Sequence, residues 1–335
     1  MSFRICAIGC GALASRAHGP SYRKYAALNT DVELVACCDL DDTKATAFRD
    51  AFGFGNHYSD FREMLRKEKP DAVCLVVPVS FTAPLSCEIL AMGIPLLMEK
   101  PPGMTGDECR AMITAAESSG TPNQVAFNRR YAPLVRELKS QLDACTPPEA
   151  IQNLQYTFMR INRRDVDFST TAIHGIDTTQ FLAGAGYESV AFRYQELPEF
   201  GATVANIFMD CVMTSGATAQ LSFCPMSGVL IERATITAHN HTFFLNIPIW
   251  NAFDAPGRLL HVEKGTVVSD VDGTTVSDGD EMFESSGFYA ENACFFDDIR
   301  AGRKPHGDIR SGLESVEIAD CIRNRIVEYH ASPTS

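Results

Sequence analysis

Short apolar segments alternate with amphipathic segments through the first part of the chain. Apolar runs at residues 3–8, 32–38, 72–77 and 124–127, and the run that ends at Glu99, predict buried strands. The segments at residues 43–52, 61–67, 84–92 and 105–119 predict helices, and a glycine follows three of them. Gly19-Pro20 is expected to kink or break the first helix. Strands that alternate with helices predict a parallel, doubly wound sheet.

After about residue 150 the pattern changes to alternating apolar and polar positions. Strands are predicted at residues 203–209, 217–223, 232–238, 242–247 and 259–262, mostly antiparallel, with helices at 173–182, 288–301 and 309–329. An antiparallel sheet of this kind needs a cover on its apolar face. The three helices can cover only part of it, so we expect a homodimer or homotetramer formed through this sheet.

A glycine-rich turn follows the first predicted strand. Gly9-Cys10-Gly11-Ala12-Leu13-Ala14 is a G-x-G-x-x-A sequence that opens a helical segment. Gly9 permits a tight turn, Gly11 lets the backbone approach a pyrophosphate, and the helix N-terminus favours negative charge. Asp39 ends the second strand, at the distance where an acidic side chain accepts the ribose hydroxyls of NAD. Together these features predict a dinucleotide-binding Rossmann domain.

The residues that follow Asp39 favour NAD(H) over NADP(H). Leu40, Asp41 and Asp42 provide no arginine for a 2′-phosphate, and their carboxylates would repel it. The nearby Lys44 and Arg16 leave NADP(H) open.

Lys100 stands where an apolar strand ends and Pro101-Pro102 begin. A proline restricts the residue before it to extended conformations, so the lysine cannot continue into a helix. The carboxyl ends of strands are where ligands bind in an open α/β sheet. Lys100 is therefore a candidate for substrate or cofactor contact, and a solvated lysine is the alternative.

Composition narrows the class of protein. The 335 residues are 45% hydrophobic with a formal net charge of −13, which disfavours nucleic acid or an anionic membrane as a partner. No apolar run reaches the roughly 18 residues that span a bilayer, and no signal-peptide pattern opens the chain, so a cytoplasmic location is expected. The twelve cysteines include several in apolar strands and are expected to be reduced. No C-x-x-C pair or zinc-type spacing is present, so no metal is predicted.

Five motifs together resemble the glucose-fructose oxidoreductase, inositol dehydrogenase and rhizopine-catabolism (Gfo/Idh/MocA) family of nicotinamide-dependent oxidoreductases. They are the glycine turn, Glu99-Lys100-Pro101, Phe127-Asn128-Arg129-Arg130-Tyr131, Ile173-His174-Gly175-Ile176-Asp177, and Phe288-Tyr289 with the segment 295–299. The resemblance spans nearly the whole chain. It implies an α/β protein with a Rossmann domain at residues 1–125 and an α+β domain with a large open, mostly antiparallel sheet at 126–335. The second domain would bind substrate and form the oligomer, and the helix at 131–142 would pack back on the first domain.

The resemblance also implies site residues. Lys100 and His174 would be catalytic, because a histidine suits proton exchange at neutral pH and a lysine can polarise the substrate oxygen or relay the proton. The implied cofactor contacts are Gly9, Gly11, Ala12, Leu13, Asp39, Pro78, Thr82, Glu99, Lys100 and Asn128. The implied substrate contacts are Asp177, Arg130, Arg160, Thr170 and Tyr289. For Arg130 the alternative is that it anchors the two domains through a carboxylate. For Arg160, Arg163 and Arg164 the alternative is that they form a solvated face.

Two positions depart from the family pattern. Thr170 stands where many relatives carry an Asp one helical turn before the histidine, and Thr82 stands where a histidine often lies near the nicotinamide. The usual polyol contacts are therefore in doubt.

The predicted function is an NAD(P)-dependent oxidoreductase acting on CH–OH donors, with a sugar, cyclitol or related hydroxylated ring as substrate. Three alternatives remain. They are a glycoside-cleaving enzyme with transient redox, a trans-dihydrodiol dehydrogenase, and a non-catalytic dinucleotide-binding regulator. Trp250 and the pair Phe243-Phe244 could line an apolar ring site or belong to the sheet core.

Overall fold

The structure is a computed structural model that describes residues 2–250 and 252–331. These residues form two compact units. The first lies within Met1–Asn128 and Gly287–Val316, and the second within Arg129–Ser286 and Glu317–Ser335.

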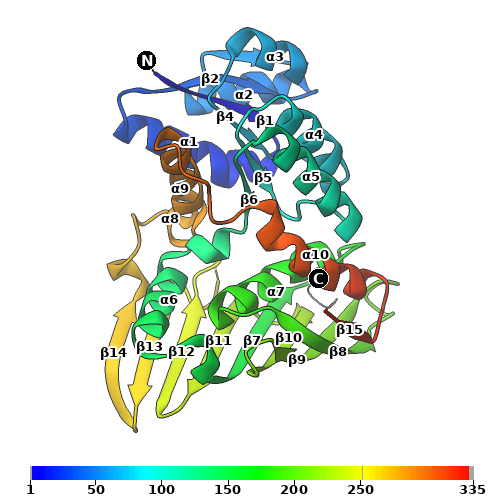
Figure 1. Cartoon of the computed structure of the whole chain (residues 1–335), viewed down its shortest axis with the longest axis vertical. Helices are drawn as coiled ribbons and strands as arrows, with labels where there is room; N and C mark the ends of the chain where they lie inside the picture. Colours follow the sequence, from blue (N-terminus) through cyan, green and yellow to red (C-terminus); the bar gives the residue numbers. More distant parts are fainter. Residues whose placement is uncertain (1, 251, 332–335) are drawn as a thin grey trace. The chain divides into compact units, whose positions relative to one another are not determined.

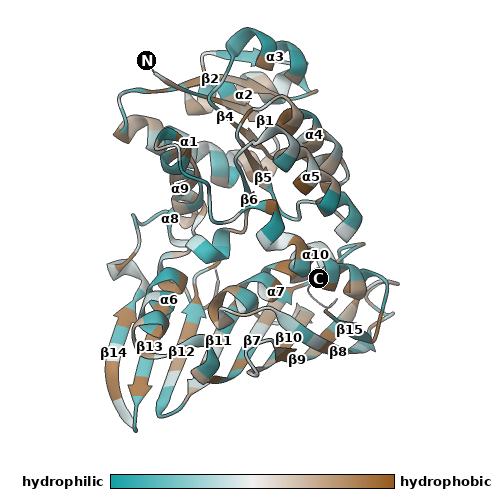
Figure 2. Ribbon diagram, viewed as in Figure 1, coloured by the Kyte–Doolittle hydropathy of each residue, from teal (hydrophilic) through white to brown (hydrophobic). Residues whose placement is uncertain are grey.

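The first unit is built on a parallel sheet of six strands in the order β3-β2-β1-β4-β5-β6 (Figure 1). The strands are β1 (Phe3–Ile8), β2 (Val32–Cys38), β3 (Asn56–Tyr58), β4 (Ala72–Leu75), β5 (Leu96–Glu99) and β6 (Asn123–Ala126). The helices are η1 (Ala14–His18), α1 (Gly19–Leu28), α2 (Asp42–Phe52), α3 (Phe61–Glu68), α4 (Val79–Ala91), α5 (Gly106–Ser119) and α9 (Phe288–Arg300), with the start of α10 (Ile309–Arg323). Every residue of β4, β5 and β6 is buried, as expected for strands covered on both faces. Figure 2 shows the hydropathy of the residues along these elements. The predicted doubly wound sheet is confirmed.

The first helix changes type at the predicted break. Residues Ala14–His18 are π-helical and α1 begins at Gly19 with Pro20 in its first turn, so the helical segment changes its hydrogen-bond spacing just before a residue that has no N–H. A Cβ on Gly19 would lie 2.5 Å from the Phe52 ring, so a glycine is needed at this crossing.

The second unit is built on a nine-stranded sheet in the order β14-β13-β12-β11-β7-β10-β9-β8-β15. The strands are β7 (Ile151–Ile161), β8 (Tyr187–Glu196), β9 (Ala205–Met213), β10 (Thr218–Ser227), β11 (Ile231–Ala238), β12 (His241–Ile247), β13 (Arg258–Glu263), β14 (Thr266–Asp272) and β15 (Glu328–His330). Short helices in this unit are η2 (Asn128–Tyr131), η3 (Pro148–Ala150), η4 (Gly273–Thr275) and α8 (Met282–Ser285). The neighbouring strands are antiparallel except for the parallel pair β7 and β10. The predicted open, mostly antiparallel sheet is confirmed.

Two longer helices pack on this sheet. They are α6 (Pro133–Cys145), which lies on β12 and β13, and α7 (Ser169–Ala183), which lies on β7 and β10 (Figure 1).

The helix expected at 131–142 is α6, whose buried face, which includes Leu138 and Leu142, packs on β12 and β13, and its packing on the first domain remains a prediction. Two other predictions about helices were wrong. The helix expected at 288–301 on the second sheet is α9, whose Phe295 and Phe296 belong to the core around α1 in the first unit. The helix expected at 309–329 ends at Arg323, because the chain then forms β15 along the edge of β8. The predicted boundary between a dinucleotide-binding domain and a substrate-binding domain at residue 125 remains a prediction. The segment 287–316 lies with the first unit.

Candidate active site

The glycine turn joins β1 to the first helix. Gly9 has φ +92°, and a Cβ there would lie 2.0 Å from the carbonyl oxygen of Val76, so the fold itself requires this glycine. A Cβ on Gly11 would meet no atom within 4 Å, so the space beside it is open. Ala12 is exposed and Leu13 half-buried at the start of the helix, where the first backbone N–H groups lack intrahelical partners. The turn therefore has room and donors for a pyrophosphate.

Asp39 is held against the same turn. Its Oδ2 accepts a hydrogen bond from the Cys10 N–H at 2.8 Å, and its Oδ1 accepts one from the Asp41 N–H at 2.9 Å. The carboxylate is half-buried and keeps lone pairs beyond those two bonds. Gly9, Gly11 and Asp39 are thus brought together as predicted, and their arrangement fits a dinucleotide.

Lys100 follows β5 and is half-buried, and its peptide bond to Pro101 is cis. The preceding residue, Glu99, is buried and faces inward. Its Oε2 accepts from the Lys100 N–H at 3.0 Å, and its Oε1 lies 2.9 Å from Nε2 of His18. Glu99 was predicted to contact the cofactor, but both of its carboxylate oxygens are hydrogen-bonded within the protein. Its bond to the Lys100 N–H fixes the backbone of that lysine.

The tautomer of His18 follows from its second neighbour. The Asn292 amide nitrogen donates to Phe288 O at 2.7 Å and lies 3.2 Å from Nδ1 of His18. Because an amide N–H can only donate, Nδ1 accepts, so Nε2 carries the proton and donates to Glu99. His18 was not identified from the sequence, since its partners are far along the chain.

The other predicted cofactor residues differ in accessibility. Pro78 is exposed ahead of α4, but Thr82 is only 1% exposed, while the side chain of Phe81 beside it is 56% exposed. Asn128 is also 1% exposed. Tyr289, a predicted substrate contact, packs half-buried against the core of the first unit, with Nζ of Lys24 4.4 Å from its ring centroid.

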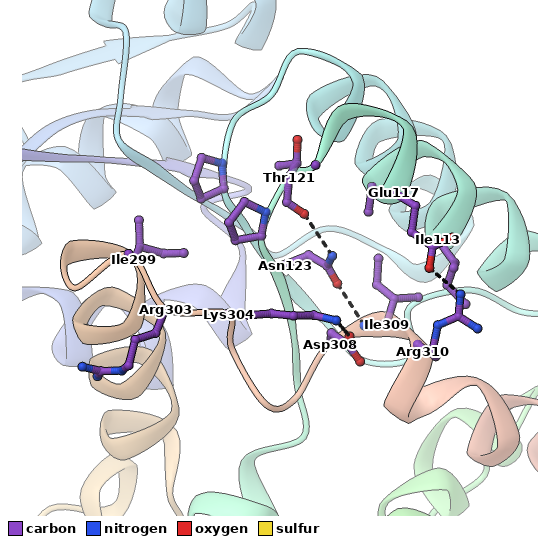
Figure 3. A pocket seen from close by; sticks show the side chains of 15 residues that line it. Ile113, Glu117, Thr121, Asn123, Ile299, Arg303, Lys304, Asp308, Ile309 and Arg310 are labelled. Carbon is purple, nitrogen blue, oxygen red and sulfur yellow. Dashed lines mark hydrogen bonds and ion pairs between the residues drawn. The ribbon is translucent and has the colours of Figure 1, made fainter.

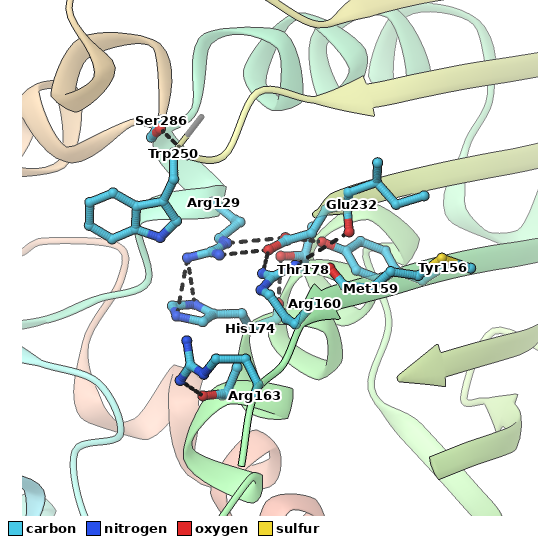
Figure 4. Close-up of polar contacts among 12 residues, drawn as sticks. Arg129, Tyr156, Met159, Arg160, Arg163, His174, Thr178, Glu232, Trp250 and Ser286 are labelled. Atoms are coloured by element: carbon cyan, nitrogen blue, oxygen red, sulfur yellow. Dashed lines mark hydrogen bonds and ion pairs between the residues drawn. The ribbon is translucent and has the colours of Figure 1, made fainter. Parts of the chain in front are cut away.

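The second unit holds a buried polar cluster around His174, which lies on α7 and is 7% exposed (Figure 4). Nη1 of Arg129 lies 3.1 Å from both ring nitrogens of His174. The same guanidinium donates to both carboxylate oxygens of Glu232, at 2.7 and 3.2 Å. Arg160 also donates to Glu232, and the Tyr156 hydroxyl donates to it at 2.8 Å.

Glu232 is ionised in this cluster. Its complete burial alone would raise its pKa, but the charges of Arg129 and Arg160 and the hydrogen bonds from Arg129 and Tyr156 lower the pKa to about 2. Two guanidiniums and one carboxylate leave a net charge of +1 among these three groups. The His174 ring therefore lies beside an excess of positive charge.

Arg130 and Asp177 pair with each other. Nε of Arg130 donates to Oδ2 of Asp177 at 2.9 Å and Nη2 to Oδ1 at 2.5 Å, and Asp177 is 1% exposed. Arg130 thus pairs with a carboxylate, but Asp177 belongs to the same unit, so this pair does not link the two domains as the alternative proposed. The Thr170 hydroxyl, half-buried one turn before His174, donates to the Asp167 carbonyl at 3.0 Å. Arg163 pairs with Asp165 on a partly exposed surface.

Residues 3–127 match the family model described as an oxidoreductase family with an NAD-binding Rossmann fold, GFO_IDH_MocA. This stretch of the chain therefore resembles the Rossmann domain of that family. The resemblance predicted from the motifs is confirmed, as is the class of cofactor that the domain binds.

Two curated relatives support this assignment. The chain is 31% identical to D-glucoside 3-dehydrogenase from Escherichia coli over 139 residues, and 32% identical to D-apiose dehydrogenase from Paraburkholderia graminis over 138 residues. These alignments cover 42% and 40% of this chain, but the chain spans only 38% and 34% of the two relatives.

A similar fold extends over the whole chain. The solved structure of levoglucosan dehydrogenase in complex with NADH superposes with a TM-score of 0.85, at 17% identity, over 100% of both chains. Among the helices within residues 2–250 and 252–331, none has both the length and the apolar content needed to cross a membrane.

A cavity of about 510 Å³ lies elsewhere in the first unit (Figure 3). Pro95 and Pro122, which precede β5 and β6, line it, so it is at the amino ends of these strands, opposite the edge that carries the glycine turn and Lys100. Its cations Arg303, Lys304 and Arg310 pair with Asp298, Asp308 and Glu117. We therefore do not assign the chemistry to this cavity.

Proposed function

We propose that this protein is an NAD(H)-dependent oxidoreductase that moves a hydride between nicotinamide and a secondary hydroxyl or keto group of a sugar, cyclitol or related hydroxylated ring. The observation that carries the proposal is the placement of His174 beside Arg129 in a buried, positively charged cluster. When bound, the nicotinamide ring supplies the hydride acceptor or donor. The residues of the chain must then handle the proton of the substrate hydroxyl.

His174 is proposed as the base that receives this proton. A neutral imidazole has one unprotonated nitrogen; Nη1 of Arg129 lies equally close to both ring nitrogens, and the unprotonated one would give up this contact when it takes the substrate proton. The net charge of +1 from Arg129, Arg160 and Glu232 would stabilise negative charge that develops on the substrate oxygen.

Lys100 is proposed to polarise the substrate oxygen or relay its proton, with Glu99 and His18 as positioning residues. The buried Glu99 carboxylate accepts from the Lys100 backbone N–H and is itself fixed by His18. Asp177, Arg130, Arg160 and Thr170 are proposed to shape the substrate site, the first two as a paired unit. Asp39 is proposed to favour NAD(H).

The proposed substrate class is supported by relatives whose names are those of sugar and cyclitol dehydrogenases, including an inositol 2-dehydrogenase from Ralstonia nicotianae. A homodimer or homotetramer formed through the open sheet and a cytoplasmic location belong to the same proposal. The transient-redox, dihydrodiol and regulator alternatives would each keep NAD binding, so turnover must separate them.

The test is nicotinamide reduction, followed in the near ultraviolet, with NAD and then NADP across a panel of aldoses, inositols and glycosides. Lys100→Met is run in parallel, with the surface variant Lys67→Met as control. Substrate-dependent reduction that is lost only in Lys100→Met would support the proposal. Cofactor binding with no net reduction on any substrate would overturn it in favour of the transient-redox or regulator alternatives.

A further inference from the structure

Three metal-ligating side chains meet on the covered face of the second sheet. Cys145 is the last residue of α6, His241 is the first residue of β12, and His261 lies in β13. One potential ligand atom from each lies within 4.8 Å of the other two. The closest pair is Nδ1 of His241 and Nε2 of His261, which are 2.9 Å apart.

The fold holds these residues together. Phe243 pairs with His261 across β12 and β13, so His241, two residues before Phe243, is a diagonal neighbour of His261 on the same face. The helix α6 crosses both strands with Leu142 buried against the sheet. Cys145 follows Leu142 by three residues and therefore lies on the same side of the helix.

The arrangement is partly rigid and partly accessible. The His261 ring is 8% exposed and stacks on Phe243, with ring centroids 4.0 Å apart and planes inclined by 19°. His241 is half-buried and Cys145 is exposed, so an ion can reach the group from solvent. The Cys145 thiol now donates to the Gln141 carbonyl at 3.0 Å, a bond that a metal–sulfur bond would replace.

The donor set and spacing suit zinc. Metal–ligand lengths of about 2.3 Å to sulfur and 2.0 Å to nitrogen at tetrahedral angles place neighbouring donors about 3.3–3.5 Å apart. The observed separations are 2.9 Å between the two histidine nitrogens and at most 4.8 Å from the thiol to either, so they bracket these values. Thiolate and imidazole are the ligands that Zn²⁺ prefers, and the net charge of −13 favours cations over anions generally.

We propose that Cys145, His241 and His261 bind one Zn²⁺ ion, with water as the fourth ligand. Binding forms one Zn–S and two Zn–N bonds in place of bonds from the ion to water, and the thiol proton leaves to solvent. The histidine that donates in the 2.9 Å contact carries its proton on its other ring nitrogen instead, and no redox state changes. The ion would cross-link the end of α6 to β12 and β13 and so stabilise their packing. The sequence predicted no metal because these residues are far apart along the chain and show no ligand spacing.

The site is tested with Co²⁺ as a spectroscopic probe. The full chain is stripped with a chelator, its thiols are kept reduced, and Co²⁺ is added while absorbance is recorded. We expect one equivalent to bind with a thiolate-to-cobalt charge-transfer band in the near ultraviolet, and Zn²⁺ to displace it. The band should vanish in Cys145→Ser, and affinity should fall at least tenfold in His241→Ala.

The matched control is Cys224→Ser, a half-buried cysteine of β10 outside the cluster, which should bind as wild type does. Zn²⁺ should also raise the melting temperature of wild type and Cys224→Ser but not of Cys145→Ser. A wild-type protein without the band, or a band that persists in Cys145→Ser, would overturn the proposal. Circular dichroism confirms that each variant is folded, and the exposed position of Cys145 makes its replacement mild. None of these readouts depends on turnover.

Discussion

Nη1 of Arg129 lies 3.1 Å from both nitrogens of the His174 ring, while Nη2 and Nε of the same guanidinium donate to the two carboxylate oxygens of Glu232. The guanidinium therefore orients the imidazole and links it to a buried carboxylate. Because Nη1 is equally distant from the two nitrogens, the contact is compatible with either neutral tautomer of the ring.

Replacing His174 with alanine should lower kcat by about 10²- to 10⁴-fold, the usual contribution of a positioned acid or base. NAD affinity should stay unchanged, since the glycine turn and Asp39 belong to the other unit. Steady-state kinetics and a cofactor fluorescence titration measure the two quantities. His330→Ala, at an exposed histidine, is the control. Equal kcat in the two variants would remove His174 from the mechanism.

Glu232→Gln should destabilise the second unit by about 3–5 kcal/mol, because it leaves two buried guanidiniums without their carboxylate. Urea unfolding at pH 7 measures the loss. Glu63→Gln, which removes an exposed pair with Lys67, should cost about 1 kcal/mol or less.

The stabilisation that Glu232 provides should depend on pH. The folded pKa of Glu232, about 2, lies below its ordinary value of 4.5, so its stabilisation is complete above pH 4.5 and is lost as the pH falls towards 2. The difference in unfolding free energy between wild type and Glu232→Gln should shrink across that window. A constant difference would contradict the assigned pKa.

Alanine at the two glycines of the turn should separate folding from binding. Gly9→Ala forces a Cβ against the Val76 carbonyl and should lower the melting temperature by several degrees. Gly11→Ala meets open space, so stability should hold while NAD affinity falls at least tenfold. Thermal unfolding and calorimetric titration distinguish the two effects. Full NAD affinity in Gly11→Ala would place the pyrophosphate elsewhere.

Asp39→Ser should weaken NAD binding and reduce the preference over NADP, because the carboxylate that would repel a 2′-phosphate is gone. The ratio of the two dissociation constants is the measurement. Asp107→Ser, at an exposed helix position, should leave the ratio as it is. If wild type already binds NADP as tightly as NAD, Asp39 has no part in selection.

The open face of the second sheet should form the oligomer interface. In β12, Phe243 is buried while Phe244 on the opposite face is 44% exposed. Phe244→Asp should therefore reduce the mass measured by light scattering during size-exclusion chromatography to that of a monomer. Val166→Asp, at an exposed position outside the sheet, is the control. A monomeric wild type would end the proposal.

Local sequence was sufficient to predict the candidate dinucleotide-binding residues at the carboxyl edge of the first unit's sheet. A glycine at φ +92°, a helix directly after it and an acid at the end of the next strand follow from short segments whose preferences do not depend on distant partners. The positions of Lys100 and of His174 on a helix also followed from the chain. The partner of Glu99 did not, since His18 meets it only through the packing of the first helix against β5.

The sequence by itself determined the class of each unit, the dinucleotide turn and the cofactor class, because strand alternation, glycine conformation and strand-end placement are local properties. The tertiary structure alone decided which charges neighbour His174, that Arg130 closes on Asp177, and that Cys145 lies over His241 and His261. Such pairings depend on the register of strands and on the packing of helices between residues far apart in the chain. No local pattern encodes them, because each side chain is compatible with many partners until the sheet has formed.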